Sequence, residues 1–269
     1  NTLVVEDVLS YLPQKVQERL RGFGFAGKAI LSDIEVKGTY NDSLMPLIST
    51  KVVTDNMMVN ISQLPYPFTQ VNLDGKLELN FNTEANSFTV NSLSAKFNRS
   101  SLTAEGLVDD LLGDVGLKLK VKGDVPMSDI KSYLPKNLNL QGRTNLDLVT
   151  NFTYAQLDKS LEDYNLNRLS AKANLRIKDF VFDMDTIHAV APVLNVGLTL
   201  PTRITLATSQ LDAQVGKGIK ANLKNPDIKL TADHLKGGIE KMLLNADLKF
   251  GQMDVIYDSL TAHIDKPTT

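Results

Sequence analysis

The segment Leu73-Asp74-Gly75-Lys76-Leu77-Glu78-Leu79-Asn80-Phe81 decides the fold class, because apolar residues recur at every second position with polar residues between them. Successive side chains of a β-strand point to opposite faces of a sheet, so this alternation predicts a strand with one buried face. The same pattern recurs over 115–122, 146–148, 169–177 and 244–250. Such repetition predicts a mainly β protein.

Turn-forming residues separate these predicted strands. Asn, Asp and Gly favour tight turns, which join neighbouring antiparallel strands as hairpins, whereas parallel strands need long crossovers. The predicted turns are Gly38–Ser43, Asn82–Ser87, Asn98–Ser100, Gly113–Asp114 and Gly216–Gly218. The sequence therefore predicts antiparallel pairing.

Helical signals are few and short. Apolar spacing over 4–20 fits a helix, but Pro13 divides it into two short helices. Short helices are also predicted over 128–134 and 154–164. The segment 185–194, which contains Pro192, is ambiguous between helix and strand.

An internal repeat indicates tandem organisation. Glu6–Pro13 aligns with Ser128–Pro135, sharing Asp, Ser, Tyr, Leu and Pro, and each copy precedes a strand that contains Gly. A weaker match relates Leu93–Lys96 to Leu211–Gln214 at nearly the same spacing. A repeating period is typical of a unit used in series. We therefore predict one β-rich repeat over 1–122, with an N-terminal helical segment, and a second over 123–269 that continues it within one structural unit.

Composition excludes several function classes. The 29 Lys and Arg residues against 31 Asp and Glu give a net charge of −2, which argues against a nucleic-acid partner. Cysteine is absent, so disulfides, thiolate metal sites and a Cys nucleophile are excluded. No apolar run reaches the ~18 residues of a membrane-spanning helix. The sequence opens at Asn1 rather than Met, which leaves room for a signal peptide or anchor upstream.

A longer run of motifs resembles the AsmA family. The resemblance rests on the order of these pieces, which are Leu73–Leu79, Phe88–Lys96, Ser101–Gly106, Val108–Asp114, Leu117–Gly123 and Met127–Ile130. It is clearest over 73–148 and looser over 166–230. AsmA-like and TamB-like proteins form long curved β-sheets, so the resemblance completes the expected fold. That fold is a curved antiparallel sheet of two tandem β-rich repeats of similar length with a few short helices.

The resemblance also implies a location and a function. Family members lie in the periplasm of Gram-negative bacteria, held in the inner membrane by an N-terminal helix that this sequence lacks. They support outer-membrane assembly or lipid transport, and their apolar sheet face shields acyl chains. The implied partners are a phospholipid or another envelope lipid, together with envelope assembly proteins; no cofactor is expected. Three Asp-Ser/Thr-aliphatic motifs, beginning at Asp42, Asp185 and Asp258, resemble Bacteroidetes glycosylation sites.

Candidate lipid-facing residues are the apolar members of the alternating strands. They are Leu77, Leu79, Phe81, Leu117, Leu119, Val121, Leu146, Leu148, Leu175 and Ile177. Few predicted helices are available to cover such a face, so it could remain open to acyl chains. The alternative is that the same residues form the closed core of a β-sandwich. The protein would then be a scaffolding module that contacts other envelope proteins and binds no lipid.

Catalytic chemistry finds little support in the sequence. The histidines His188, His234 and His263 lie far apart, and no nucleophile elbow or phosphate loop occurs. His263 and Asp265 would share one face of a strand, as a metal pair does, but no third ligand is visible. We therefore expect neither a metal site nor an enzyme. Lys118, Lys120 and Lys122 form a basic stripe that could meet phosphate headgroups, although such stripes are usually the solvated face of a strand.

Overall fold

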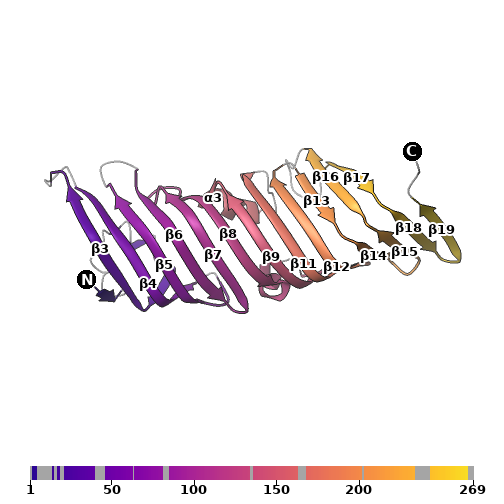
Figure 1. Ribbon diagram of the computed structural model, residues 1–269, viewed down its shortest axis with the longest axis horizontal. Coiled ribbons are helices and arrows are strands. Elements are labelled where there is room, and N and C mark those ends of the chain that lie inside the picture. Colours follow the sequence, from indigo (N-terminus) through magenta and orange to yellow (C-terminus); the bar gives the residue numbers. More distant parts are fainter. Residues whose placement is uncertain are drawn as a thin grey trace. The chain divides into compact units, whose positions relative to one another are not determined.

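The computed structural model describes residues 2–4, 14, 17, 18, 21–39, 46–62, 64–80, 85–133, 136–162, 168–201, 203–233 and 243–265. These residues confirm the predicted class, since they form mainly antiparallel strands with few short helices (Figure 1). The chain divides into two compact units. Unit 1 comprises Asn1–Lys122 and Val149–Lys159, and unit 2 comprises Gly123–Leu148 and Ser160–Thr269. The tandem repeat itself stays a prediction.

Unit 1 is built from neighbouring antiparallel strands. They are β1 (Thr2–Val4), β2 (Phe23–Ala26), β3 (Lys28–Lys37), β4 (Leu47–Ile61), β5 (Phe68–Leu79), β6 (Ser87–Phe97), β7 (Ser100–Asp109), most of β8 (Gly116–Pro126) and β10 (Phe152–Thr153). β3 pairs with β1 and β4, and β2 also pairs with β4. The strands β4 to β7 then pair in chain order, and β8 pairs with β10.

Unit 2 holds the remaining strands. They are most of β9 (Leu138–Thr150), with β11 (Ala171–Met184), β12 (Ile187–Leu200), β13 (Arg203–Ala207), β14 (Gln210–Val215), β15 (Ile219–Lys224), β16 (Asp227–Asp233), β17 (Leu243–Lys249), β18 (Gln252–Tyr257) and β19 (Leu260–Asp265). β11 pairs with β12, whose first half pairs with β14 and whose second half pairs with β13. One branch continues as β13–β16–β17 and the other as β14–β15–β18–β19.

The two branches of unit 2 share one pairing register. Ile187 lies opposite Val215 and Asn195 lies opposite Ala207, so β13 and β14 follow β12 as one interrupted strand. The same holds for β15 with β16, which are interrupted at Asn225 and Pro226, and for β17 with β18. Unit 2 is therefore a simple meander of long strands that carry interruptions.

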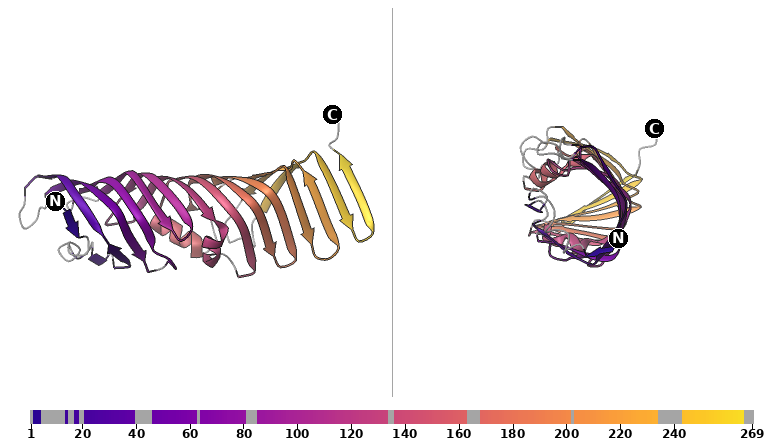
Figure 2. Two further views of the ribbon diagram at one scale, coloured as in Figure 1. Left: turned by 60° about the horizontal axis from the view of Figure 1, so that its bottom comes forward. Right: turned by 90° about the vertical axis from the view of Figure 1, so that its left-hand side faces the viewer.

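Residues with positive φ accompany irregular positions within several strands. Asn56 (φ 52°) and Gln70 (φ 50°) stand at the register shifts between β4 and β5. Asp179 (φ 51°) interrupts the alternation of burial along β11, although β11 and β12 keep one pairing register across it. An extra residue in a strand bends it and increases its twist, and Asn and Asp tolerate this conformation better than most residues. In Figure 2 the strands of unit 1 follow an arc rather than a straight line.

The short helices lie where the sequence predicts them. η1 (Met127–Tyr133) is a 3₁₀-helix, and α3 (Tyr154–Glu162) is an α-helix. α3 begins with a reciprocal cap: the backbone N of Gln156 donates to Thr153 Oγ1 (3.3 Å), and the backbone N of Thr153 donates to Gln156 Oε1 (2.9 Å). Such a capping box satisfies two backbone donors that the helix leaves without partners.

The structure tests three further sequence predictions to different extents: the segment 185–194, the turns and the N-terminal helices. The ambiguous segment 185–194 is a turn at Asp185 followed by strand β12, which includes Pro192. The predicted turns at 98–100, 113–114 and 216–218 are confirmed. The remaining two turns lie partly, and the helix over 4–20 mostly, outside the described residues.

Among the described residues, fully buried apolar side chains form two small clusters. In unit 2, Met127 of η1 packs with Ile177, Ala191 and Leu194. In unit 1 the buried cluster is Met57, Val71 and Ala95, with aromatic and aliphatic neighbours that are only partly buried. The strand faces that carry these clusters are therefore the apolar faces of the two units.

Candidate functional site

The apolar face of unit 2 consists of rows of side chains that run across the strands. Directly paired residues share a face of the sheet, so the register defines each row. The first row is Ile187, Val215, Ile219, Tyr257 and Leu260. The second is Ala189, Ala213, Ala221, Val255 and Ala262, and the third is Leu211, Leu223, Met253 and Ile264.

The first row is open to solvent. Val215 is 44% exposed, Ile219 is 40% exposed and Leu260 is 70% exposed. Large apolar side chains that are scattered singly on a surface are unremarkable, but a contiguous apolar surface usually marks a site of interaction. This continuous row therefore makes the apolar face of unit 2 the leading candidate site.

Four of the predicted lipid-facing residues lie in unit 2. Ile177 is buried at 4% exposure, and Leu175 is half-buried and packs against the cluster around it. Leu175 also begins a further row through Val196 and Leu206. Leu146 and Leu148 on β9 are half-buried.

The other predicted residues that the structure describes lie in unit 1, where they are half-buried rather than buried. Leu77 stands opposite Thr50 on one side and Phe88 on the other, and Leu79 stands opposite Ile48. Leu117, Leu119 and Val121 alternate along β8 and are also half-buried. Phe81 lies outside the described residues. The structure thus distributes the predicted residues over two apolar faces, one in each unit.

A small apolar pocket lies within the face of unit 2. Its volume is about 210 Å³, and its lining includes Phe180, Phe182, Leu194, Leu206 and Ile228. Phe180 directly follows Asp179, the positive-φ residue of β11, and Leu194 lies opposite Ile177. The pocket offers no charged side chain, so it suits an apolar group.

The sequence reasoning missed the exposed first row of unit 2. Apart from Ile187 on β12, its members belong to the short strands β14, β15, β18 and β19, which breaks such as Asn225-Pro226 separate from their continuations. The signal was nevertheless present. Leu211, Ala213 and Val215 alternate with polar residues, as do Ile219, Ala221 and Leu223.

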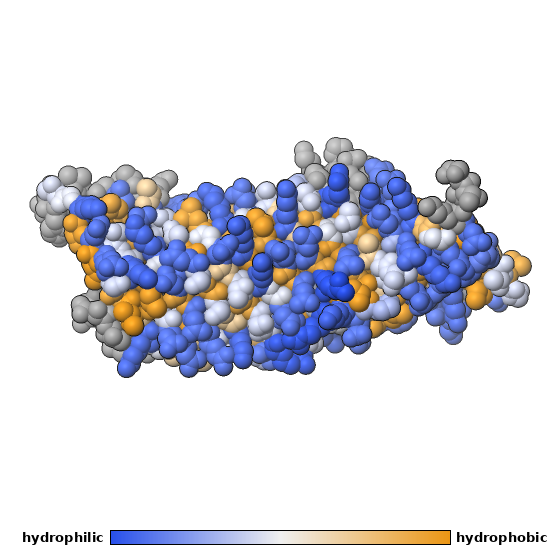
Figure 3. Space-filling model, in the orientation of Figure 1, coloured by the Kyte–Doolittle hydropathy of each residue, from blue (hydrophilic) through white to orange (hydrophobic). Residues whose placement is uncertain are grey.

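In unit 1, the polar face of the sheet carries ion pairs between neighbouring strands. Lys118 Nζ lies 2.6 Å from Asp109 Oδ2, and Lys120 Nζ lies 3.3 Å from Glu105 Oε1. Two lysines of the predicted basic stripe are therefore neutralised by carboxylates of the neighbouring strand. Figure 3 shows mainly hydrophilic residues on the face in view, with apolar residues between them. The stripe is thus a solvated strand face and offers little charge to a phosphate headgroup.

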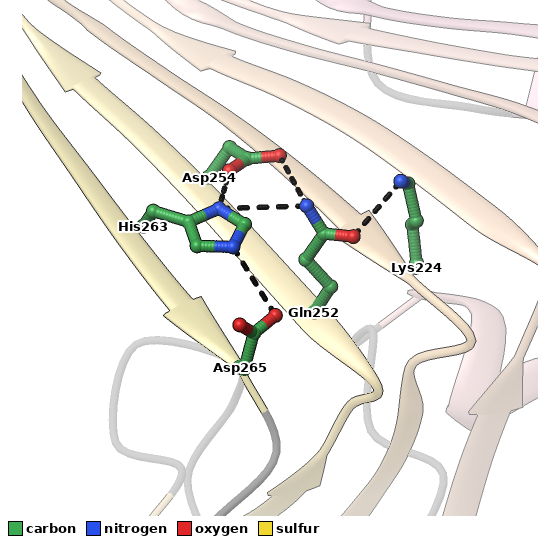
Figure 4. Close-up of polar contacts among 5 residues, drawn as sticks. All are labelled: Lys224, Gln252, Asp254, His263 and Asp265. Atoms are coloured by element: carbon green, nitrogen blue, oxygen red, sulfur yellow. Dashed lines mark hydrogen bonds and ion pairs between the residues drawn. The ribbon is translucent and has the colours of Figure 1, made fainter.

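A polar cluster surrounds His263 on β18 and β19 (Figure 4). His263 Nδ1 bonds Asp254, and Nε2 lies 3.1 Å from Asp265 Oδ1, which confirms that His263 and Asp265 share a face. The bond from Asp254 and the charge of Asp265 raise the pKa of His263 above its ordinary value of 6.5. The same bond to His263 is the main cause of a lowered pKa for Asp254.

This cluster is not arranged as a metal site. The two ring nitrogens of His263 point to different carboxylates, so the three groups do not converge on one point. Within the described part of the chain, no group of three His, Cys, Asp or Glu residues could hold a metal ion. His188 makes a similar exposed pair with Asp183, which also accepts a bond from Asn139 (3.0 Å). His234 lies outside the described residues.

No family model, curated protein or solved structure matches the chain. None of the helices that the structure describes is both long and apolar enough to cross a membrane.

Proposed function

We propose that this protein shields lipid acyl chains along its apolar sheet faces. The observation that carries the proposal is the exposed row in unit 2, from Ile187 through Val215 and Ile219 to Tyr257 and Leu260. This row continues across successive strands and ends in side chains as exposed as Tyr257 (58%) and Leu260 (70%). An acyl chain laid along it would remove its own surface and that of the row from water.

The energetics favour a ligand with a long apolar segment. Each buried methylene contributes about 0.8 kcal/mol, so a chain of several methylenes binds without a directional polar contact. The apolar face offers aliphatic and aromatic side chains, and its pocket adds a recess for part of a chain. A lipid of one fixed headgroup is not required by this arrangement.

The cellular setting is part of the same proposal. The resemblance to the AsmA family favours a periplasmic protein of a Bacteroidetes-type Gram-negative bacterium, tethered to the inner membrane through an N-terminal anchor. There it would support outer-membrane assembly or lipid transport, with a phospholipid or another envelope lipid as ligand and envelope assembly proteins as partners. Neither a cofactor nor an enzymatic step belongs to this role.

The test is mass spectrometry of organic extracts of the protein purified from its native envelope without detergent. A periplasmic protein of similar mass, purified in the same way, is the control. Stoichiometric phospholipid or glycolipid in the sample alone supports the proposal and identifies the lipid class. An extract indistinguishable from the control contradicts it and favours a scaffolding module that binds other envelope proteins.

A further inference from the structure

A depression lies on the polar face of unit 2, on the opposite side of the sheet from the apolar rows. Its volume is about 410 Å³, and its lining includes Asn145 and Asp147 of β9, Asn174 and Arg176 of β11, and Asn195 and Gly197 of β12. Leu175 points to the apolar face, so Asn174 and Arg176 on either side of it point to this one. The depression is therefore distinct from the proposed acyl-chain site.

Gly197 keeps the depression open. A Cβ atom at this position would lie 2.5 Å from Thr205 Oγ1 and 3.9 Å from Asn174 Oδ1. Any larger residue would fill the space between these side chains. The missing side chain thus creates the hollow around which the polar groups stand.

Several polar side chains of the depression have hydrogen-bond donors and acceptors that no described residue uses. Within the part of the chain that the structure describes, the side chains of Asn145, Asp147, Asn174 and Arg176 make no hydrogen bond or ion pair with one another or with other residues. Arg143, also on β9, differs: Asp124 accepts bonds from its Nε (2.7 Å) and Nη2 (2.8 Å). Arg176 therefore presents a guanidinium that no described carboxylate neutralises.

Among the side chains that the structure describes around the depression, cations outnumber carboxylates. On this stretch of the polar face the cations are Lys172, Arg176, Lys178, Arg203, Lys229 and Lys249, and the carboxylates are Asp147, Asp179, Asp227 and Asp247. Lys229 stands directly opposite Asp247 and Lys249 directly opposite Asp227, so the excess lies with the cations of β11 and β13. Lys229 stands directly opposite Thr205, and Arg203 directly opposite Thr199. An excess of positive charge around a hollow attracts an anion.

We propose that this depression binds an anionic saccharide, a hexose that carries a phosphate or carboxylate group. Arg176 would hold the anionic group, since guanidinium binds both groups through paired N–H donors. The amides of Asn145, Asn174 and Asn195 can each donate to and accept from sugar hydroxyls, and Asp147 can accept from them. A bare anion would use Arg176 but would be repelled by Asp147 and would leave the amides of Asn145 and Asn174 without partners, whereas Asn195 Nδ2 already donates to the backbone O of Ala207 (3.5 Å).

The test is a calorimetric or ligand-detected NMR titration of the intact chain with glucose 1-phosphate and with glucuronate. Glucose, which lacks the anionic group, and inorganic phosphate, which lacks the sugar hydroxyls, are the matched control ligands. We expect at least one anionic sugar to bind at millimolar or lower concentration. Glucose should bind about tenfold more weakly because it lacks the charged hydrogen bond to Arg176, and phosphate about tenfold more weakly because it has no hydroxyls for the amides. The two anionic sugars together identify which group Arg176 prefers.

Variants assign the binding to this depression. Arg176→Gln should weaken binding of the preferred sugar about tenfold, because it removes the charged donor but keeps a polar side chain of similar reach. Lys120→Gln, an exposed cation on β8 of unit 1, is the control and should bind like the parent. Circular dichroism establishes that both variants are folded. Unchanged binding by Arg176→Gln, phosphate binding as tight as glucose 1-phosphate, or no binding of either anionic sugar would overturn the proposal.

Discussion

Ile177 and Phe180 face the same side of β11 although their positions differ by three residues. Ile177 lies opposite Leu194, Phe180 lies opposite Ala191, and all four belong to one apolar cluster. Side chains three positions apart in a regular strand would point to opposite faces. Asp179, with a φ of 51°, supplies the local change of backbone that restores Phe180 to the apolar face. The bend therefore keeps the face continuous.

Substitutions at Asp179 should reveal the cost of this bend. Asp179→Val should lower the free energy of unfolding by about 1–2 kcal/mol, because a β-branched residue adopts positive φ poorly. Asp179→Gly should leave it unchanged or raise it by up to about 1 kcal/mol, since glycine accepts this conformation. Asp179 is exposed, so packing changes little. Urea unfolding measures both effects.

Lys178→Val is the matched control for Asp179→Val. Lys178 is the exposed neighbour on the same strand, with no positive φ, and valine favours strands. Its stability should stay within about 0.5 kcal/mol of the parent. An equal loss in Lys178→Val and Asp179→Val would show that backbone conformation at Asp179 is not the cause.

Two threonines on β9 should respond to the same substitution with opposite signs. Thr150 Oγ1 accepts from the backbone N of Leu119 (3.0 Å) and donates to the backbone O of Leu117 (2.9 Å). The buried Thr144 Oγ1 has no partner among the described residues. Thr150→Val should destabilise by about 1–3 kcal/mol, whereas Thr144→Val should stabilise by up to about 1 kcal/mol. Thermal or urea unfolding that gives both variants the same sign would contradict these bonding assignments.

The hairpin of β18 and β19 should depend on pH through His263. Because its folded pKa is raised above 6.5, the contribution of His263 is complete below pH 6.5 and is lost as the pH rises through the folded value. Asp254 has a pKa lowered from 3.8, so its contribution is present above pH 3.8 and is lost as the pH falls through its folded value. The hairpin should therefore be held best between pH 3.8 and 6.5.

Amide hydrogen exchange of residues 260–265 measures this dependence. Protection, corrected for the intrinsic exchange rate, should fall as the pH rises from 6.5 through the raised pKa of His263 and should depend less on pH in His263→Gln. Exchange of β14 amides serves as an internal reference. A parent hairpin whose protection does not change over this range would exclude a role for His263 in fastening β19.

Most strand positions can be predicted from the sequence, because burial of one sheet face makes apolar and polar residues alternate with a period of two. Alternation over 73–81 and 169–177 correctly predicts β5 and the start of β11. It does not predict how β11 continues, since the irregular position at Asp179 shifts the phase. The segment 185–194 is ambiguous in the sequence and contains Pro192, which the structure nevertheless includes in strand β12. Such local backbone changes depend on neighbouring strands, which a single segment does not reveal.

The candidate face is only partly readable from the sequence. Leu175 and Ile177 are correctly assigned to an apolar face, but alternation alone does not distinguish a buried residue such as Ile177 from an exposed one such as Ile219. That difference depends on what packs above the sheet, here Met127 of η1 over Ile177 and no described element over Ile219. Which element packs over a strand face is decided by tertiary structure. The exposed row could therefore be identified only from the structure.

The most direct test compares acyl-chain binding by variants of two directly paired positions on opposite faces. Val215→Glu/Ile219→Glu places two charges on the exposed apolar row, and Gln214→Glu/Lys220→Glu places two carboxylates at the adjacent pair of the polar face. Both variants alter the same two strands, and circular dichroism checks their fold. We predict that lipid recovered per protein falls at least about fivefold in the first variant, since a charge disfavours an apolar ligand, and stays at the parent level in the second. Equal lipid content in both folded variants would contradict it.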